Sequence, residues 1–359
     1  MRLPEKISAL LKRRSTLFLL LVPLIAVGFV LQAVGTPLIL NIYTYFCVNL
    51  MIVLALQMFM GNSGILAWTH VAWVGIGAYA SGILSMAPMV KSLGVPNMYP
   101  HLVELQLPVV PAILLGGVVA AIVAAIIGWP LMRLSNAVGV ITLFATLIVV
   151  HVVMTQWDNV TNGPRTFFGL QEFTRLPQAL VGAILVLLLA HWYRESSLGL
   201  RLRAARDDRF AAMAIGVSVV QVRYVAFVLS ALIAGIGGGV WAHFITSFSP
   251  KAFYITETFL LLTMLVIGGQ GSISGAFTGT ALVTVAREVL RQVESGMNNS
   301  GMFSFEVYGL TELVMAVLMV IVLIWRPSGI IGGQEITWPL LKRKNRPDDG
   351  PGTDVVEPA

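Results

Sequence analysis

Long apolar runs follow one another through most of the 359 residues, and this pattern limits what the chain can fold into. A helix needs about 20 mainly apolar residues to cross the hydrocarbon core of a bilayer. Only 11% of the residues are charged, against roughly 25% in soluble globular domains. Because a helix satisfies its backbone hydrogen bonds without water, we predict an all-α, polytopic membrane protein embedded in a lipid bilayer.

Charges, prolines, glycines and polar clusters divide these runs into about ten expected transmembrane helices. The segment 65–89 fits either one tilted helix or a broken one. We expect a basic N-terminus at 1–14, one membrane domain at 15–332 and a disordered tail at 333–359, which is polar and has no periodicity. The expected spans lie near residues 15–35, 38–60, 65–89, 108–132, 135–156, 177–193, 217–245, 254–269, 273–291 and 307–325.

The basic residues predict which way the chain is threaded. Lys and Arg accumulate in cytoplasmic loops, and with the N-terminus inside, 17 of the 23 basic residues fall on the cytoplasmic side. An even number of spans then places both termini in the cytoplasm. The pI near 9.6 is therefore a topology signal and not the footprint of a nucleic-acid partner. The six basic residues on the outer side are Lys91, Arg165, Arg175, Lys251, Arg287 and Arg291.

One predicted cytoplasmic loop, at 194–216, concentrates charge in the stretch "GLRLRAARDDRFAAMAIG". We expect a single helix here, ended by Gly199 and Gly216, with Arg203, Arg206, Asp207 and Phe210 on one face at helical spacing. A solvated basic loop that serves only the threading of the chain is one reading. The other is a docking helix, in which Arg and Asp make polar contacts, Ala permits close approach and Phe210 enters a partner's groove.

Signatures of enzyme chemistry are absent from the sequence. The five histidines show no metal-ligand spacing, and the single cysteine, Cys47, can form neither an internal disulfide nor a metal cluster. There is no G-x-S-x-G motif and no Walker motif. We therefore expect no metal and no cofactor, and any ATP must be hydrolysed by another chain.

Several motifs in order resemble one transporter family. The run from Ser197, "SLGLRLRAARDDRFAAMAIG", and its following span resemble the branched-chain amino acid ABC permeases, in particular the LivM-type membrane subunit. The similarity extends over roughly residues 40–332. The other landmarks are "GIGAY" from Gly75, "TNGP" from Thr161, "SP" at Ser249 followed by "LVIGGQGSISGAFTG", and "RPSGIIG" from Arg326.

The resemblance implies an importer of the bacterial inner membrane with a fold similar to that of the cobalamin importer's membrane domain. Its partners would be two ABC ATPase subunits, a second, homologous permease and a periplasmic substrate-binding protein. The loop at 194–216 would couple the chain to the ATPases. The residues expected to do so are Arg201, Arg203, Ala204, Arg206, Asp207, Asp208, Phe210, Ala211, Ala212 and Gly216.

The substrate and its path are less constrained than the class of transporter. "QMFMGNSGILAWTHVAWVGIGAY" and "SNAVGVITLFATL" depart from the usual family patterns, and relatives also move urea, short amides and aromatic acids. From polarity and position we expect His70, Trp73, Asn136 and Thr142 to line the translocation path, with core packing as the competing reading. An ion-coupled secondary transporter is the alternative class, although Glu312 is the one acidic residue clearly inside an expected span.

Overall fold

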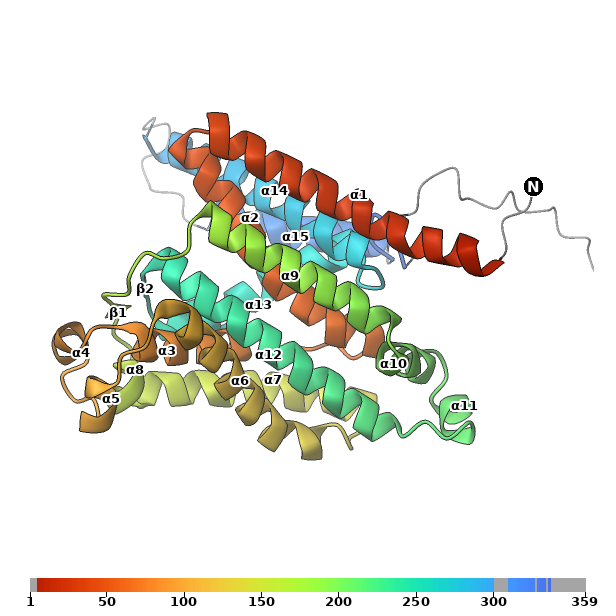
Figure 1. Cartoon of the computed structure of the whole chain (residues 1–359), viewed down its shortest axis with the longest axis horizontal. Helices are drawn as coiled ribbons and strands as arrows, with labels where there is room; N and C mark the ends of the chain where they lie inside the picture. Colours follow the sequence, from red (N-terminus) through yellow and green to blue (C-terminus); the bar gives the residue numbers. More distant parts are fainter. Residues whose placement is uncertain (1–4, 300–308, 327, 334, 337–359) are drawn as a thin grey trace, which may run out of the picture.

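The computed structural model describes residues 5–299, 309–326, 328–333 and 335–336, which form an all-α bundle (Figure 1). Ten helices of 14 or more residues occur in these ranges, and each overlaps one expected span. These long helices are α1 (Glu5–Val34), α2 (Pro37–Leu56), α3 (His70–Ser85), α6 (Val109–Leu131), α7 (Asn136–Gln156), α9 (Leu176–Glu195), α12 (Val219–Ile245), α13 (Ile255–Gly268), α14 (Ile273–Asn299) and α15 (Leu310–Trp325).

Length and composition support a multi-pass membrane protein. Six segments are both long and apolar enough to cross a bilayer, and α13 and α15 are apolar but shorter. The count of ten spans stays a prediction. The six segments are Thr16–Val34, Pro37–Gly61, Val109–Leu131, Ala137–Gln156, Leu176–Glu195 and Val219–Ile245.

The segment expected at 65–89 is broken rather than a single tilted helix. Helix α3 begins only at His70 and ends at Ser85, and the separate α4 (Pro88–Gly94) begins at a proline. Proline lacks a backbone N–H and is favoured in the first turn of a helix, where that donor has no partner. Before this segment, α2 continues as a π-helical turn, η1 (Gln57–Gly61).

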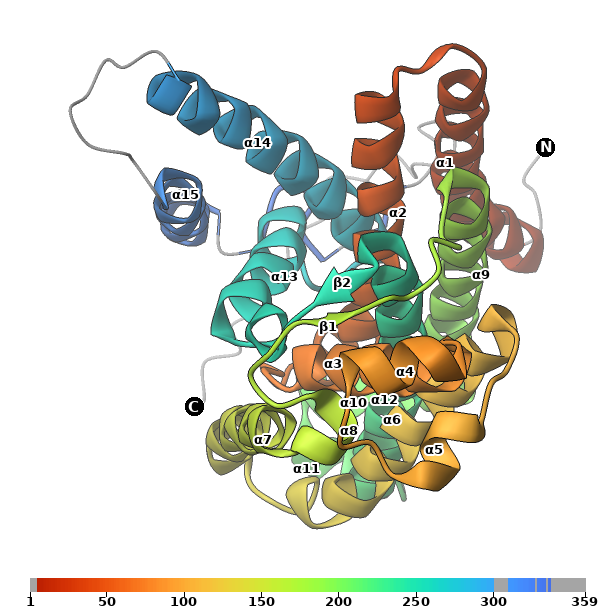
Figure 2. The same cartoon turned by 90° about the vertical axis from the view of Figure 1, so that its left-hand side faces the viewer.

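The short elements gather at one end of the bundle and the charged loop at the other (Figure 1). Helices α10 (Ser197–Asp207) and α11 (Arg209–Ala214) lie at the end where α1 begins. Strand β1 (Phe167–Phe168) pairs antiparallel with β2 (Ser247–Phe248), and Phe167 lies opposite Phe248. This end of the bundle faces the viewer in Figure 2. The other short elements there are α4, α5 (Pro100–Glu104), α8 (Asp158–Thr161) and η2 (Pro250–Phe253).

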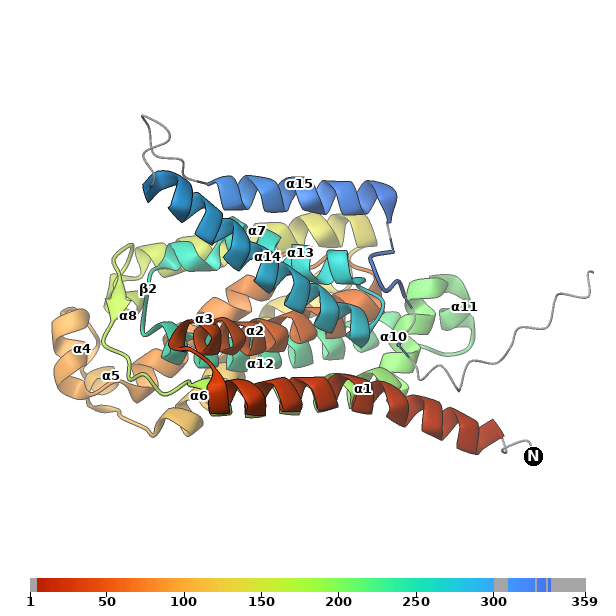
Figure 3. The same cartoon turned by 90° about the horizontal axis from the view of Figure 1, so that it is seen from above.

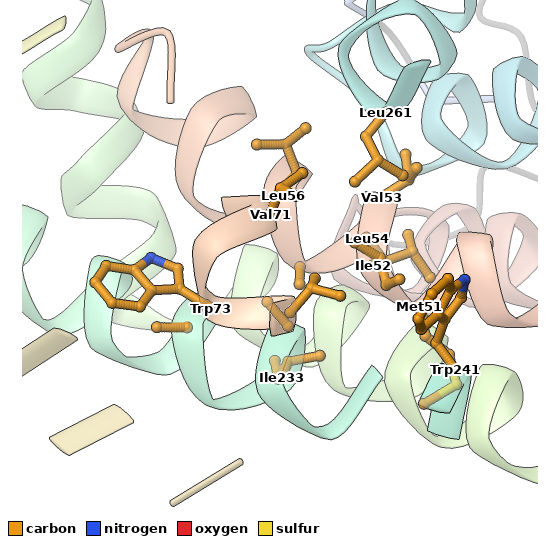
Figure 4. Close-up of a cluster of buried hydrophobic side chains, with 14 of the residues drawn as sticks. Met51, Ile52, Val53, Leu54, Leu56, Val71, Trp73, Ile233, Trp241 and Leu261 are labelled. Carbon is orange, nitrogen blue, oxygen red and sulfur yellow. The ribbon is translucent and has the colours of Figure 1, made fainter. Parts of the chain in front are cut away.

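Helices α3, α6 and α12 form what we call the three-helix frame, which has the most extensive helix contacts in the described part of the chain. Glycine makes this packing possible, because a Cβ atom at Gly238 would overlap the Val74 carbonyl oxygen and one at Gly77 would overlap that of Gly235. The glycine-rich run from Ala234 thus lets helices approach closely. Figure 4 shows apolar side chains of α2, α3, α12 and α13 meeting in the core beside it.

The remaining helices surround this frame. Helices α1 and α15 lie on opposite flanks (Figure 3). Helix α2 packs against α9, α12 and α14, and α13 packs against α14. Seen along the bundle, α14 diverges from α2 toward α15 (Figure 2).

Candidate functional site

The charged loop forms two helices instead of the single one expected. Helix α10 ends at Asp207, and the extended backbone of Asp208 separates it from α11. The Asp208 carboxylate accepts hydrogen bonds from the backbone N–H groups of Phe210 (2.8 Å) and Ala211 (3.0 Å). This is the usual role of Asp at a helix N-cap, so Arg206 and Phe210 do not share one helix face.

Of the two glycines expected at the ends of this stretch, Gly216 follows the last helical turn as expected, whereas Gly199 does not lie at a helix end. Gly199 lies inside α10, where a Cβ would collide with the Tyr193 and Arg194 carbonyl oxygens at the end of α9. Glycine therefore allows the tight bend between α9 and α10. Gly216 follows α11 with a φ of 85°, the left-handed conformation that glycine adopts freely at helix ends.

Two arginines hold α10 against the transmembrane helices. The Arg206 guanidinium donates to the Gly61 carbonyl at 2.7 Å, and its side chain packs on Gly64, which has a φ of 71°. Arg203 donates to the Arg194 carbonyl at 3.0 Å. Arg206, which we expected to contact a partner, thus has an anchoring contact within the chain.

A buried ion pair joins the beginning of this loop to the C-terminal segment. The Arg194 guanidinium pairs with the Glu335 carboxylate and also donates to the Gly271 carbonyl (3.3 Å). Glu335 accepts hydrogen bonds from the backbone N–H groups of Ile273 (2.8 Å) and Ser274 (3.0 Å), so it caps the N-terminus of α14. We call this arrangement the Arg194–Glu335 clamp. Glu335 belongs to the expected tail, of which residues 337–359 lie outside the described residues.

The surface of α10 and α11 combines charge with exposed apolar groups. Phe210 is 79% exposed and Ile215 is 77% exposed. Ala212 instead packs with Ala205 and Val219 and fixes α11 to the start of α12. Of the other residues expected in the coupling surface, Arg203 is half-buried, whereas the exposed ones are Arg201, Ala204, Arg206, Asp207, Asp208, Ala211 and Gly216.

Three of the four residues expected to line the path have described side chains, and these lie on α3 and α7. His70 and Trp73 lie buried on α3, where His70 Nε2 is 3.1 Å from Ser230 Oγ and Trp73 packs edge-on against Phe227. Thr142 lies half-buried on α7, and its hydroxyl donates to the Val138 carbonyl. Asn136 begins α7, but its side chain lies outside the described residues. His70 and Trp73 therefore face the protein core in this conformation, and the path assignment stays a prediction.

The remaining polar residues show no metal centre. Within the described ranges, no group of His, Cys, Asp and Glu has the arrangement to hold an ion. His243 contacts Ser85 Oγ at 2.8 Å, and His151 stacks on Tyr254. Glu312, in the first turn of α15, is exposed.

Two polar contacts were not predicted from the sequence. The clamp joins residues far apart in the chain, and no spacing rule connects them. Glu257 and Arg287 form an ion pair at 3.8 Å between α13 and α14. We counted Arg287 with the outer basic residues, although α14 continues to Asn299 and holds Arg287 well inside the helix. A charge in the interior of an expected span was the available signal.

The class that these observations define is a multi-pass α-helical membrane protein with a charged, partly apolar surface at one end. The family described as "Branched-chain amino acid transport system / permease component" matches residues 38–323, so the chain belongs to it.

Individual relatives agree with this assignment. The high-affinity branched-chain amino acid transport system permease protein LivM of Escherichia coli is 26% identical over 96% of this chain and 80% of its own length. LivM of Salmonella typhimurium is 26% identical over 85% of this chain and 72% of its own. A probable LivH permease of Methanocaldococcus jannaschii is 25% identical over 57% and 62%. No solved structure gave a significant match.

Proposed function

We propose that this chain is a membrane-spanning subunit of an ATP-driven importer for branched-chain amino acids, and that α10 and α11 contact an ATPase subunit. The exposed Phe210 and Ile215, next to the basic residues of the loop, carry this proposal. Together with Met213 they form a group of exposed apolar side chains, and apolar patches rimmed by polar residues mark interaction sites. Because Arg203 and Arg206 anchor α10 to the transmembrane helices, a movement of α11 would be transmitted to these helices.

The complete assembly would contain two ABC ATPases, a second, homologous permease and a periplasmic binding protein. The names of the LivM and LivH relatives support an amino-acid substrate and a second permease. The binding protein would dock on the outer segments 91–107, 157–176 and 246–253. We further propose ten spans with the cobalamin-importer type of fold, in the bacterial inner membrane, with both termini cytoplasmic. The alternative substrates for the same class of importer are urea, short amides and aromatic acids.

A comparison of loop variants tests the coupling role. Phe210→Ser and Asp207→Ala alter exposed side chains, so both variants should insert and fold normally. Losing an interface anchor typically costs about 1–4 kcal/mol of binding free energy. We expect the ATPase subunits to co-purify less well with these variants, or to hydrolyse ATP without uptake.

Arg209→Lys is the matched control, because it keeps the positive charge and should preserve uptake. If Phe210→Ser and Asp207→Ala both retain ATPase association and uptake, the loop has no docking role. Uptake by the lone chain, driven by a proton or sodium gradient, would instead favour a secondary transporter.

A further inference from the structure

A charged pair lies within the helix bundle, away from the end that carries α10 and α11. Glu257 is in the first turn of α13, and Arg287 is in the middle of α14, roughly 21 Å along that helix from Ile273 at 1.5 Å per residue. Ionisable side chains inside membrane spans are costly and usually line a path for a solute or pair with each other. The geometry of this pair distinguishes these two roles.

Arg287 is held mainly by a neutral partner. Its guanidinium donates to the Tyr45 hydroxyl at 2.5 Å and lies 5.7 Å from the centre of that ring. The Glu257 carboxylate is 3.8 Å away, beyond hydrogen-bond distance, and accepts no hydrogen bond from any described residue. The two side chains remain 29% and 27% exposed. A carboxylate with free acceptor positions is therefore available to a ligand.

A second polar group lies one helical turn from Tyr45. Asn49 is 3% exposed, and its side-chain nitrogen lies beside the Tyr45 hydroxyl without a hydrogen bond of normal geometry. Buried polar groups are normally hydrogen-bonded, and an exception calls for an explanation. Asn49 and Glu257 both line a small cavity between α2, α3, α12 and α13.

The other walls of this cavity are apolar. Figure 4 shows that Ile52, Val71, Trp241 and Leu261 belong to four different helices around the core. The cavity measures about 20 Å³ in this conformation, which is room for about one water molecule. An amino acid would enter only after α13 moves away from α2. The complete lining is Asn49, Ile52, Val71, Val74, Trp241, Ala252, Phe253, Glu257 and Leu261.

We propose that Glu257, Arg287 and Asn49 bind the charged groups of a zwitterionic aliphatic amino acid on its way through the permease. The Glu257 carboxylate would accept hydrogen bonds from the substrate ammonium group. Arg287 and the Asn49 amide would donate to the substrate carboxylate, and the apolar walls would enclose the aliphatic side chain. This inference rests on the proposed function and adds to it the site that recognises the substrate.

Uptake by the whole transporter tests the proposal. The complex is placed in proteoliposomes with its binding protein, and ATP-dependent uptake of radiolabelled L-leucine is measured. Each substitution removes one charge that the substrate would contact, so Glu257→Gln and Arg287→Gln should each lower uptake by about tenfold or more. Co-purification with the ATPases should stay unchanged, because neither residue is near α10.

The control comes from the same helix. Arg291 lies one turn beyond Arg287, its side chain is 67% exposed, and it pairs with Glu288 at 3.2 Å. Arg291→Gln should therefore leave uptake close to that of the unaltered protein. Normal uptake in both Glu257→Gln and Arg287→Gln would overturn the inference while leaving the proposed function intact. No ATP-dependent uptake by the unaltered complex would refute the proposed function instead.

A charge exchange separates substrate recognition from simple pairing. Glu257→Arg combined with Arg287→Glu keeps two opposite charges together, so a purely stabilising pair would be restored along with uptake. The proposal expects a protein with normal thermal stability and no uptake, because the substrate would meet the wrong charge at each end.

Chemical labelling adds a measurement that does not depend on turnover. In a Cys47→Ala background, the Glu257→Cys variant is treated from outside with a water-soluble, membrane-impermeant thiol reagent. We expect reaction that slows when leucine-loaded binding protein is present. Failure to react both at rest and during ATP hydrolysis would place position 257 outside the path and overturn the inference.

Discussion

The three-helix frame and the contacts of α2 with α13 and α14 are held together in different ways. In the frame, glycines bring backbones into direct contact, and Gly77 and Gly238 leave no space for a side chain. Helices α13 and α14 also pack through glycine, because a Cβ at Gly279 would overlap the Met264 carbonyl oxygen, but their contacts with α2 include the Tyr45–Arg287 hydrogen bond and a small cavity. Close backbone packing has one low-energy arrangement, whereas polar side chains can exchange partners. We infer that the frame stays rigid during transport while α13 and α14 move.

The Arg194–Glu335 clamp should contribute most to stability, because it joins the end of α9 to the start of α14. Arg194→Gln leaves the Glu335 carboxylate largely buried without its cation, and removing one partner of such a pair costs about 3–5 kcal/mol. We expect a lower unfolding midpoint in detergent titrated with denaturant. Arg201→Gln, on the exposed surface of α10, should not change that midpoint. Equal stability of the two variants would mean that the clamp contributes little.

A single methyl group should disturb the frame to a smaller extent. Gly238→Ala places a Cβ against the Val74 carbonyl oxygen, and overpacking of this kind costs about 1–3 kcal/mol. Gly139→Ala in α7 is the control, since nothing lies within 4 Å of its Cβ position. Thermal unfolding should separate the two variants. A stable Gly238→Ala protein would show that the frame can yield, which contradicts its proposed rigidity.

The positions and the close packing of the frame helices could largely be predicted from the sequence. Apolar length located α6 and α12 to within two residues at each end, and small residues in a span indicate close helix packing. The other side depends on contacts between distant residues, such as Arg287 with Tyr45. Periodicity reports which residues share a face, but not which helix lies opposite. The break at Asp208 escaped prediction because Asp fits both an exposed helix face and an N-cap.

The smallest effect is expected at the end of the bundle opposite α10 and α11. Lys91 is buried and donates to the Leu102 and Leu105 carbonyls, which tie α4 to α5. Lys91→Met leaves two acceptors without a donor and should cost about 1–2 kcal/mol, confined to residues 88–107. Amide hydrogen exchange in that segment measures this loss. The exposed Lys251→Met is the control, and equal exchange in both variants would exclude an anchoring role for Lys91.

Lys91 should also make the stability of this segment depend on pH. Burial lowers the pKa of Lys91 from its ordinary value of 10.5, so the unfolded segment binds the proton more tightly than the folded one. Stability of the segment should therefore rise as pH increases toward 10.5. The Lys91→Met variant should lose that rise in hydrogen-exchange measurements.

The Arg194–Glu335 clamp also sets an order of events during synthesis. Glu335 leaves the ribosome after every helix that it joins, and at 5–20 residues per second it follows Arg194 by roughly 7–28 seconds. Until then, the N-terminus of α14 has no carboxylate cap and Arg194 has no counter-ion from this segment. A chain interrupted before residue 335 would insert its helices but would lack the ion pair and the helix cap that Glu335 provides.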